Sequence, residues 1–208
     1  MLLAIVLVLA VVAGVSIWYQ SHPPKTAAAP SPSTSAVPAT VGGDIPNGCL
    51  AGKDTSAVAL ITAQKKAPHT EAGAVGLAAA FSRWASQYPY PSAADATTVV
   101  ASLASSDADA AVREIPSQIA AKKPAEGWAS GGVSFAEGRY IVEDSTPDRV
   151  KVTVGGAGIK NGLPIPDYKV LRTLGLVWQG GIWKLQTAGA DRTVEDLFTN
   201  GAALAGGC

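Results

Sequence analysis

The sequence predicts an α+β domain in which helices come first and an antiparallel sheet follows. Two observations lead to this class: apolar residues recur at helical spacing before Gly127, and they alternate with polar residues after it. A third observation is an apolar segment at the start of the chain. We therefore expect a transmembrane anchor at residues 1–19, a linker at residues 20–44 and the α+β domain at residues 45–208.

The anchor is predicted from length and composition. Leu2 to Ile17 contains no charged side chain, and Trp18 and Tyr19 follow it. A helix of ~18 residues extends roughly 27 Å, which approaches the ~30 Å hydrocarbon thickness of a bilayer, and Trp and Tyr favour the headgroup region. We expect Leu2–Tyr19 to be retained as a single membrane-spanning helix. A signal peptide cleaved near residues 27–29 is the alternative.

The linker and the two cysteines indicate where the domain lies. Five prolines among Ala, Ser and Thr in residues 20–44 favour an extended spacer. Cys49 and Cys208 bracket almost the whole domain, and an even number of cysteines outside the cytoplasm favours a disulfide. We expect a Cys49–Cys208 disulfide and a domain held on the outer side of a cell membrane. Two separate thiols are the alternative.

The first two expected helices precede a Tyr-Pro-Tyr-Pro break at residues 88–91. Asp54 or Thr55 caps the first, which ends near Lys66, and Thr70 caps the second. The large side chains of the second helix fall at i, i+4, i+7 and i+11, on one face: Leu77, Phe81, Trp84 and Tyr88. This spacing predicts a helix that packs on the core.

Capping-box spacing predicts the remaining helices. Three pairs show it: Ser92 with Asp95, Ser106 with Asp109, and Thr193 with Asp196. Each pair precedes apolar residues at helical spacing, and Pro116 interrupts the pattern after the second pair. We therefore expect two further helices before the sheet and one after it.

Two strands are expected after Gly127. Residues 133–143 alternate and are rich in β-branched and aromatic side chains, and residues 150–154 alternate Val with polar residues. Residues 144–148 are expected to join them as a hairpin loop. Residues 155–166 are rich in glycine and proline, so a longer loop is expected there.

The last two strands give the clearest local signal. Residues 168–179 and 182–187 meet at Gly180-Gly181, which suits a two-residue hairpin turn. In this register Trp178 faces Trp183. The pairing gathers the large apolar side chains on one face, whereas a shift by one residue would split them. That face consists of Leu174, Leu176, Trp178, Trp183 and Leu185.

Composition excludes several functions. The chain has 16 basic and 16 acidic residues, a formal net charge of +0 and no basic tract, so we expect no direct nucleic-acid binding. Two cysteines and two distant histidines, His22 and His69, lack metal-ligand spacing. No nucleophile elbow or phosphate-binding loop is present in the sequence. We therefore expect no cofactor and no catalytic residue.

The helical stripe at residues 77–84, the strand at residues 132–143 and the hairpin at residues 176–185 resemble the cone-shaped fold of the nuclear-transport-factor superfamily. With one N-terminal span and a linker, the layout is similar to bitopic assembly subunits of conjugative type IV secretion systems and to actinobacterial membrane proteins. The resemblance implies a non-enzymatic scaffold subunit of a cell-envelope complex, such as a DNA-transfer channel. It implies contacts with other envelope proteins and self-association.

Two alternatives stay open. Cone-shaped domains often enclose a cavity, so an extracytoplasmic small-molecule-binding protein or a pocket enzyme is one alternative. Glu137 and Arg139 lie two apart in a predicted strand and share a face, which makes them the polar pair to place in such a pocket. The expected apolar lining is Phe135, Tyr140, Trp178 and Trp183. An accessory protein of an export or uptake machine unrelated to conjugation is the other alternative.

Overall fold

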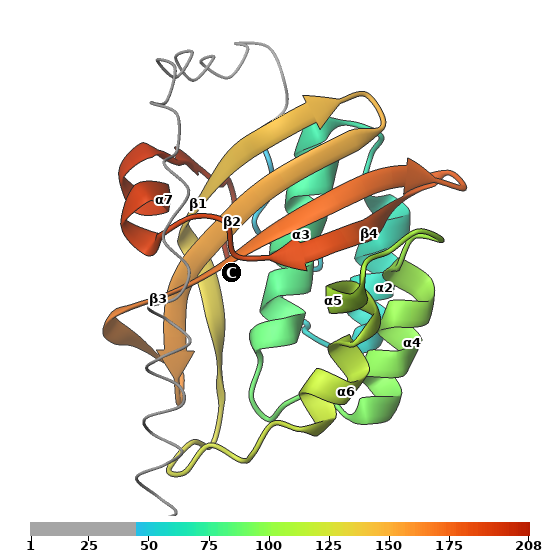
Figure 1. Cartoon of the computed structure of the whole chain (residues 1–208). Coiled ribbons are helices and arrows are strands. Elements are labelled where there is room, and N and C mark those ends of the chain that lie inside the picture. The colour runs from blue at the N-terminus through green and yellow to red at the C-terminus, as the bar shows by residue number, and fades with distance from the viewer. Residues whose placement is uncertain (1–44) are drawn as a thin grey trace, which may run out of the picture. The chain divides into compact units, whose positions relative to one another are not determined.

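The computed structural model describes residues 45–208 (Figure 1). The expected transmembrane helix at residues 2–19 and the linker at residues 20–44 lie outside the described residues. Within residues 45–208, no helix is both long enough and apolar enough to cross a membrane. These residues form an α+β domain with helices before the sheet and one helix after it, which confirms the predicted fold class.

The sheet is antiparallel, and its strands are ordered β4-β3-β2-β1-β5. The four predicted strands are all present, and a two-residue fifth strand pairs with the outer edge of β1. The bounds are β1 (Gly131–Thr146), β2 (Arg149–Lys160), β3 (Leu163–Gln179), β4 (Ile182–Gly189) and β5 (Ala202–Ala203).

The long loop predicted at residues 155–166 is wrong. β2 continues through the glycines to Lys160, and β3 already begins at Leu163. Between them Asn161 and Gly162 have φ angles of 51° and 80°, so they form a tight two-residue turn. Glycine at a crowded strand position allows close backbone approach, so the glycine-rich composition does not end the strand here.

A bulge interrupts β1 and changes which way its residues face. Ser134 pairs with Ala157 and Arg139 pairs with Gly155, so residues 135–138 stand opposite Gly156 alone. A bulge of this kind bends the strand and breaks the alternation of faces. Phe135, the first residue of the bulge, is fully buried in the core.

The predicted β3–β4 hairpin is confirmed in turn and register. Gly180 and Gly181 have φ angles of 64° and 83°, and Trp178 pairs with Trp183. The two indole rings meet edge to face with centroids 5.4 Å apart. The other residues of the predicted apolar face are at most 1% exposed: Leu174, Leu176 and Leu185.

Three helices begin at their predicted caps, which are Thr70, Ser92 and Thr193. The helices are α2 (Ala57–Lys66), α3 (Glu71–Ser86), α4 (Ala93–Leu103), α5 (Ala110–Arg113), α6 (Ile115–Ala120) and α7 (Val194–Asn200). Two predicted caps are wrong by a few residues. α2 is capped by Ser56 instead of Asp54 or Thr55, and α5 is capped by Asp109 instead of Ser106.

α3 packs on β1, β2 and β3 and forms the centre of the fold (Figure 1). Its predicted stripe is confirmed for Leu77, Phe81 and Trp84, which are at most 1% exposed. The helix ends at Ser86, so Tyr88 lies beyond it and exchanges two backbone hydrogen bonds with Gly131 instead. α2 packs beside α3, the helices α2, α4 and α5 contact β4, and α6 packs on α4 and α5.

The opposite face of the sheet carries α7 (Figure 1) and a polar network of side chains. The Thr153 hydroxyl on β2 donates to Glu143 Oε1 on β1 at 2.7 Å and lies 2.8 Å from the Thr173 hydroxyl on β3. Arg192, just before α7, donates from Nε and Nη2 to the two oxygens of Glu143, at 2.6 Å each. Its Nη1 donates to Asp196 Oδ2 at 2.5 Å.

These contacts fix the protonation state of the network. Burial acts to raise the pKa of Glu143, but hydrogen bonds from Arg192 and Thr153 and the nearby positive charges outweigh it and hold this pKa below its ordinary range. The same hydrogen bonds from Arg192 to Glu143 and Asp196 raise the pKa of Arg192. The network therefore holds the connection between β4 and α7 as an ion pair at neutral pH.

Substitution of Gly156 tests the crowding at the bulge. A Cβ on Gly156 would lie 2.2 Å from the backbone oxygen of Ser134, whereas the nearest atom to a Cβ on Gly132 is 4.0 Å away. We expect Gly156→Ala to lower the free energy of unfolding by about 1–3 kcal/mol. Gly132→Ala is the matched control and should change it little. Chemical denaturation of the full chain in detergent measures both, and equal stability of the two variants would contradict the bulge geometry.

Substitution of Arg192 tests the polar network. We expect Arg192→Met to lower the free energy of unfolding by about 1–3 kcal/mol at pH 7, because Glu143 loses its charged partner. The control Lys151→Met removes the half-exposed pair with Asp191 and only a weaker long-range attraction to Glu143, so it should cost at most about 1 kcal/mol.

The same variant should change the pH dependence of stability. Because the pKa of Glu143 is lowered by folding, its contribution is present above its ordinary value of 4.5 and is lost as the pH falls through the lower folded value. Arg192→Met should therefore lose less stability than the natural chain below pH ~4.5. Parallel acid unfolding curves for the two proteins would contradict this assignment.

Candidate functional site

The residues that the sequence places around a pocket are dispersed in the structure. Phe135 and Trp183 are fully buried in the core, where they fill space instead of lining it. Trp178 is half-buried and stacks on the His69 ring, with centroids 4.1 Å apart. Tyr140 is half-buried on β1.

The polar pair is separated by the bulge in β1. Glu137 lies within the bulge and is exposed, whereas Arg139 follows it and is half-buried. The expectation that they share a strand face depended on unbroken alternation, which the bulge removes. Neither residue lines the two depressions described below.

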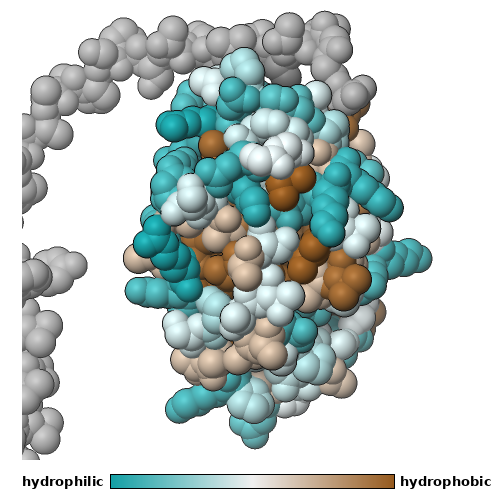
Figure 2. All heavy atoms as spheres, turned by 90° about the vertical axis from the view of Figure 1, so that its right-hand side faces the viewer, coloured by the Kyte–Doolittle hydropathy of each residue, from teal (hydrophilic) through white to brown (hydrophobic). Residues whose placement is uncertain are grey.

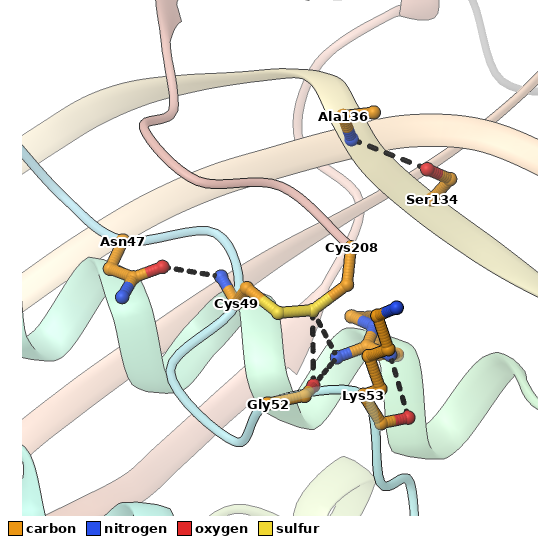
Figure 3. Close-up of a disulfide and its surroundings, with 8 residues drawn as sticks. Asn47, Cys49, Gly52, Lys53, Ser134, Ala136 and Cys208 are labelled. Atoms are coloured by element: carbon orange, nitrogen blue, oxygen red, sulfur yellow. Dashed lines mark hydrogen bonds between the residues drawn. A yellow bond between two sulfur atoms is a disulfide. The ribbon is translucent and has the colours of Figure 1, made fainter.

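The predicted disulfide is confirmed. Cys49 and Cys208 are bonded, with Cα atoms 5.4 Å apart and a sequence separation of 159 (Figure 3). The bridge joins the segment before α2 to the segment after β5. Asn47 supports it by accepting a hydrogen bond from the Cys49 backbone N–H at 2.8 Å.

A depression of about 320 Å³ lies at the end of α3 where the helix gives way to the Tyr-Pro-Tyr-Pro segment. It is open to solvent and combines aromatic rings with two cations. The side chains that define it are Tyr88, Tyr90, Lys122, Trp128, Tyr168 and Arg172. We call it the cationic depression. These side chains come from the segment between α3 and α4, from the segment after α6 and from β3. Folding of the chain is therefore needed to bring them together.

Arg172 is the innermost charge of the cationic depression. It pairs with Val154 in the sheet, on the face that α3 covers, and its guanidinium carbon lies 5.8 Å from the centre of the Phe81 ring. Its Nε is buried without a hydrogen-bond partner, and no carboxylate in residues 45–208 forms an ion pair with it. Burial lowers the pKa of this guanidinium.

Lys122 brings a second cation to the same depression. Its Nζ lies 4.6 Å from the centre of the Tyr90 ring and donates to the Ala85 carbonyl at 3.2 Å. Partial burial lowers the pKa of Lys122, and the positive charge of Arg172 lowers it further. The two cations thus repel each other, and no acidic side chain of the described residues forms an ion pair with either.

Aromatic rings form the walls beside these cations. Tyr88 meets Tyr90 and Trp128 nearly edge to face, with centroids 5.2 Å and 6.2 Å apart. Tyr168 is 52% exposed at the rim. A depression with uncompensated positive charge and ring walls is chemically suited to an anion with a flat or apolar part.

A second depression of about 340 Å³ adjoins the first, with Tyr88 and Gly132 common to both. Arg83, Thr55 and Cys208 line it. It therefore lies beside the disulfide, and the backbone pairing of Tyr88 with Gly131 runs between the two depressions.

The sequence contained one signal for this site that was not recognised from the alternation of apolar residues in β3. Arg172 has the same parity along β3 as Leu174, Leu176 and Trp178, so it occupies a position on the core-facing side. An arginine in that register is costly unless it meets a partner. Tyr88 and Trp128 carried no such signal, since their positions depend on how the segments around α6 fold back.

Comparison of the chain with protein-family models, with curated proteins and with solved structures finds no significant match.

Proposed function

We propose that the domain is a binding domain that holds the anionic group of a small molecule between Arg172 and Lys122. One observation carries this proposal: the half-buried Arg172, whose Nε is buried without a partner, and the more exposed Lys122 lie at one depression, and neither has an acidic partner among residues 45–208. A small-molecule-binding protein was the alternative that the sequence left open. The proposed site, however, differs from the expected pocket around Glu137 and Arg139.

The energetics favour a bound anion. Arg172 is half-buried, and withdrawing part of an unpaired cation from water costs free energy that a bound anion would recover. Arg172 presents a planar fork that suits a carboxylate or phosphate, and Lys122 adds a point charge. The fold therefore gives up stability at a position where an anion would recover it.

The walls limit the rest of the ligand. Tyr88, Tyr90 and Trp128 offer ring faces and edges close to the cations, which suits a flat or apolar group attached to the anion. The depression is shallow and open, so the ligand is small and keeps part of its surface in water. The class we propose is a small carboxylate or phosphate with an aromatic or apolar body.

Benzoate is a suitable probe, because benzyl alcohol offers the same ring without the charge. We expect benzoate to bind the full chain in detergent at least about tenfold more tightly than benzyl alcohol, measured by calorimetry or nuclear magnetic resonance titration. Inorganic phosphate and acetate are anions without a ring, so their affinities show how much the anionic group contributes by itself. Equal affinities for benzoate and benzyl alcohol would contradict the proposal.

Arg172→Met separates a binding role from a structural one. It should weaken benzoate binding at least about tenfold and raise the melting temperature, because an apolar side chain replaces an unpaired, half-buried charge. Arg113→Gln, which removes an exposed cation of α5, is the control and should change neither quantity. A lower melting temperature for Arg172→Met would show that the guanidinium supports the fold instead.

A second candidate function follows from the disulfide and one surface. We infer that the domain is displayed outside the cytoplasm as a subunit of an envelope complex. This inference includes the resemblance to the cone-shaped fold of the nuclear-transport-factor superfamily. Supporting it, the Cys49–Cys208 disulfide suits an oxidising compartment. Figure 2, on the side where the helices lie, shows apolar patches among hydrophilic side chains. Val58 on α2 is 74% exposed.

Site-specific crosslinking from membranes tests this candidate. A photo-crosslinking residue at Val58 should capture an envelope protein or a second copy of the chain, whereas one at exposed Ala136 of the β1 bulge should capture much less. Mass spectrometry of the products identifies the partner. Absence of a Val58-specific product would contradict a docking role for this surface.

A further inference from the structure

The disulfide has an unusual neighbour. Arg83 on α3 is 8% exposed, and its Nη1 lies 3.1 Å from Cys208 Sγ. The same nitrogen donates to the Gly52 carbonyl at 2.5 Å, and Nη2 donates to the Lys53 carbonyl at 3.3 Å. Figure 3 shows how the loop with Gly52 and Lys53 lies against the bridge. A buried positive charge therefore touches one of the two sulfur atoms.

This charge is not neutralised by an acid. Arg83 forms no ion pair with a carboxylate of the described residues, and its other partners are neutral carbonyl groups. Burial lowers the pKa of the guanidinium. A thiolate at Cys208 would supply the negative charge that is missing beside Arg83.

We propose that Cys49–Cys208 is an exchangeable redox site in which Cys208 is the leaving sulfur and the reductant is a dithiol protein. Cys49 has an Asn47 contact at its backbone, and no cation of the described residues contacts its sulfur. A thiolate leaves faster from a disulfide when its own pKa is low, so Arg83 selects Cys208 for departure.

The reaction is balanced by the dithiol. Its first thiolate attacks Cys49 Sγ, the Cys49–Cys208 bond breaks, and the electron pair remains on Cys208 as a thiolate paired with Arg83. The second thiol of the reductant, after losing its proton, attacks the mixed disulfide and releases Cys49 as a thiolate, which takes up a proton. The protein disulfide gains two electrons, and the dithiol becomes a disulfide.

Opening the bridge would change the second depression without unfolding the domain. Cys208 and Arg83 both line that depression, so reduction changes its charge while the Cys208 thiolate stays beside the guanidinium. Leu204, which is 7% exposed, still anchors the same segment, and Ala205 still pairs with Pro46 and Gly48. Reduction therefore replaces the bridge at the second depression by a Cys208 thiolate paired with Arg83, beside the anion site.

Regiochemistry of the exchange tests the proposal. The full chain in detergent is treated with limiting 2-mercaptoethanol, a neutral monothiol, and then with an alkylating agent, and peptide mass spectrometry locates the mixed disulfide. We expect the mixed disulfide at Cys49 and the alkyl group at Cys208, in at least about tenfold excess over the reverse. A mixed disulfide mainly at Cys208, or at both cysteines equally, would overturn the assignment.

Two variants show whether Arg83 is responsible. Arg83→Met should slow reduction by dithiothreitol by about tenfold or more and remove the preference for Cys49, and Arg83→Lys should restore part of both. Arg113→Gln is the control with an exposed arginine and should behave as the natural chain. Unchanged regiochemistry in Arg83→Met would overturn the role of Arg83. If that variant does not fold, the regiochemistry of the natural chain and of Arg83→Lys decides.

Discussion

The packing of α3 against the core-facing side of the sheet is the interaction on which the rest of the domain depends. Phe81 and Trp84 from the helix and Phe135 and Trp183 from the sheet are the largest fully buried side chains, and they close the interior. Close packing leaves no room for a ligand there, whereas the two depressions lie where the helix ends and loops begin. Both depressions lie at that end, which explains why charges and tyrosines gather there.

Different interactions stabilise the two faces of the sheet. The interactions on the second face direct the C-terminal segment back towards the segment that contains Cys49. Apolar packing fixes one face, whereas Glu143, Thr153 and Arg192 fix the connection that crosses the other. That connection delivers α7 and then β5 to the edge of β1, and the Phe135 backbone N–H donates to the Cys208 carbonyl at 3.0 Å. Formation of the disulfide thus depends on the polar network, which positions the segment with Cys208, as well as on the two cysteines.

Local patterns predicted the parts of the fold that depend on neighbours in sequence. The stripe on α3 and the Gly180-Gly181 hairpin needed only spacing and turn chemistry. The bulge at residues 135–138 was not predictable, because it depends on how the segment that ends at Cys208 covers the strand. The Asn161-Gly162 turn carried a recognisable signal that the surrounding glycines and prolines masked. Of the candidate site, only Arg172 was visible in the sequence, as a charge out of phase, and the anchor at residues 2–19 stays a prediction.

The disulfide has a mechanical consequence. Cys49 lies four residues after the first described residue, and Cys208 is the last, so a load applied between residues 45 and 208 crosses the sulfur–sulfur bond directly. The chain from Cys49 to Cys208 is then a closed loop that carries no tension. Pulling on residue 45 against Cys208 therefore leaves the domain between the two cysteines unextended. The sheet and both depressions keep their shape under strain, and reduction of the bridge would make the same domain extensible.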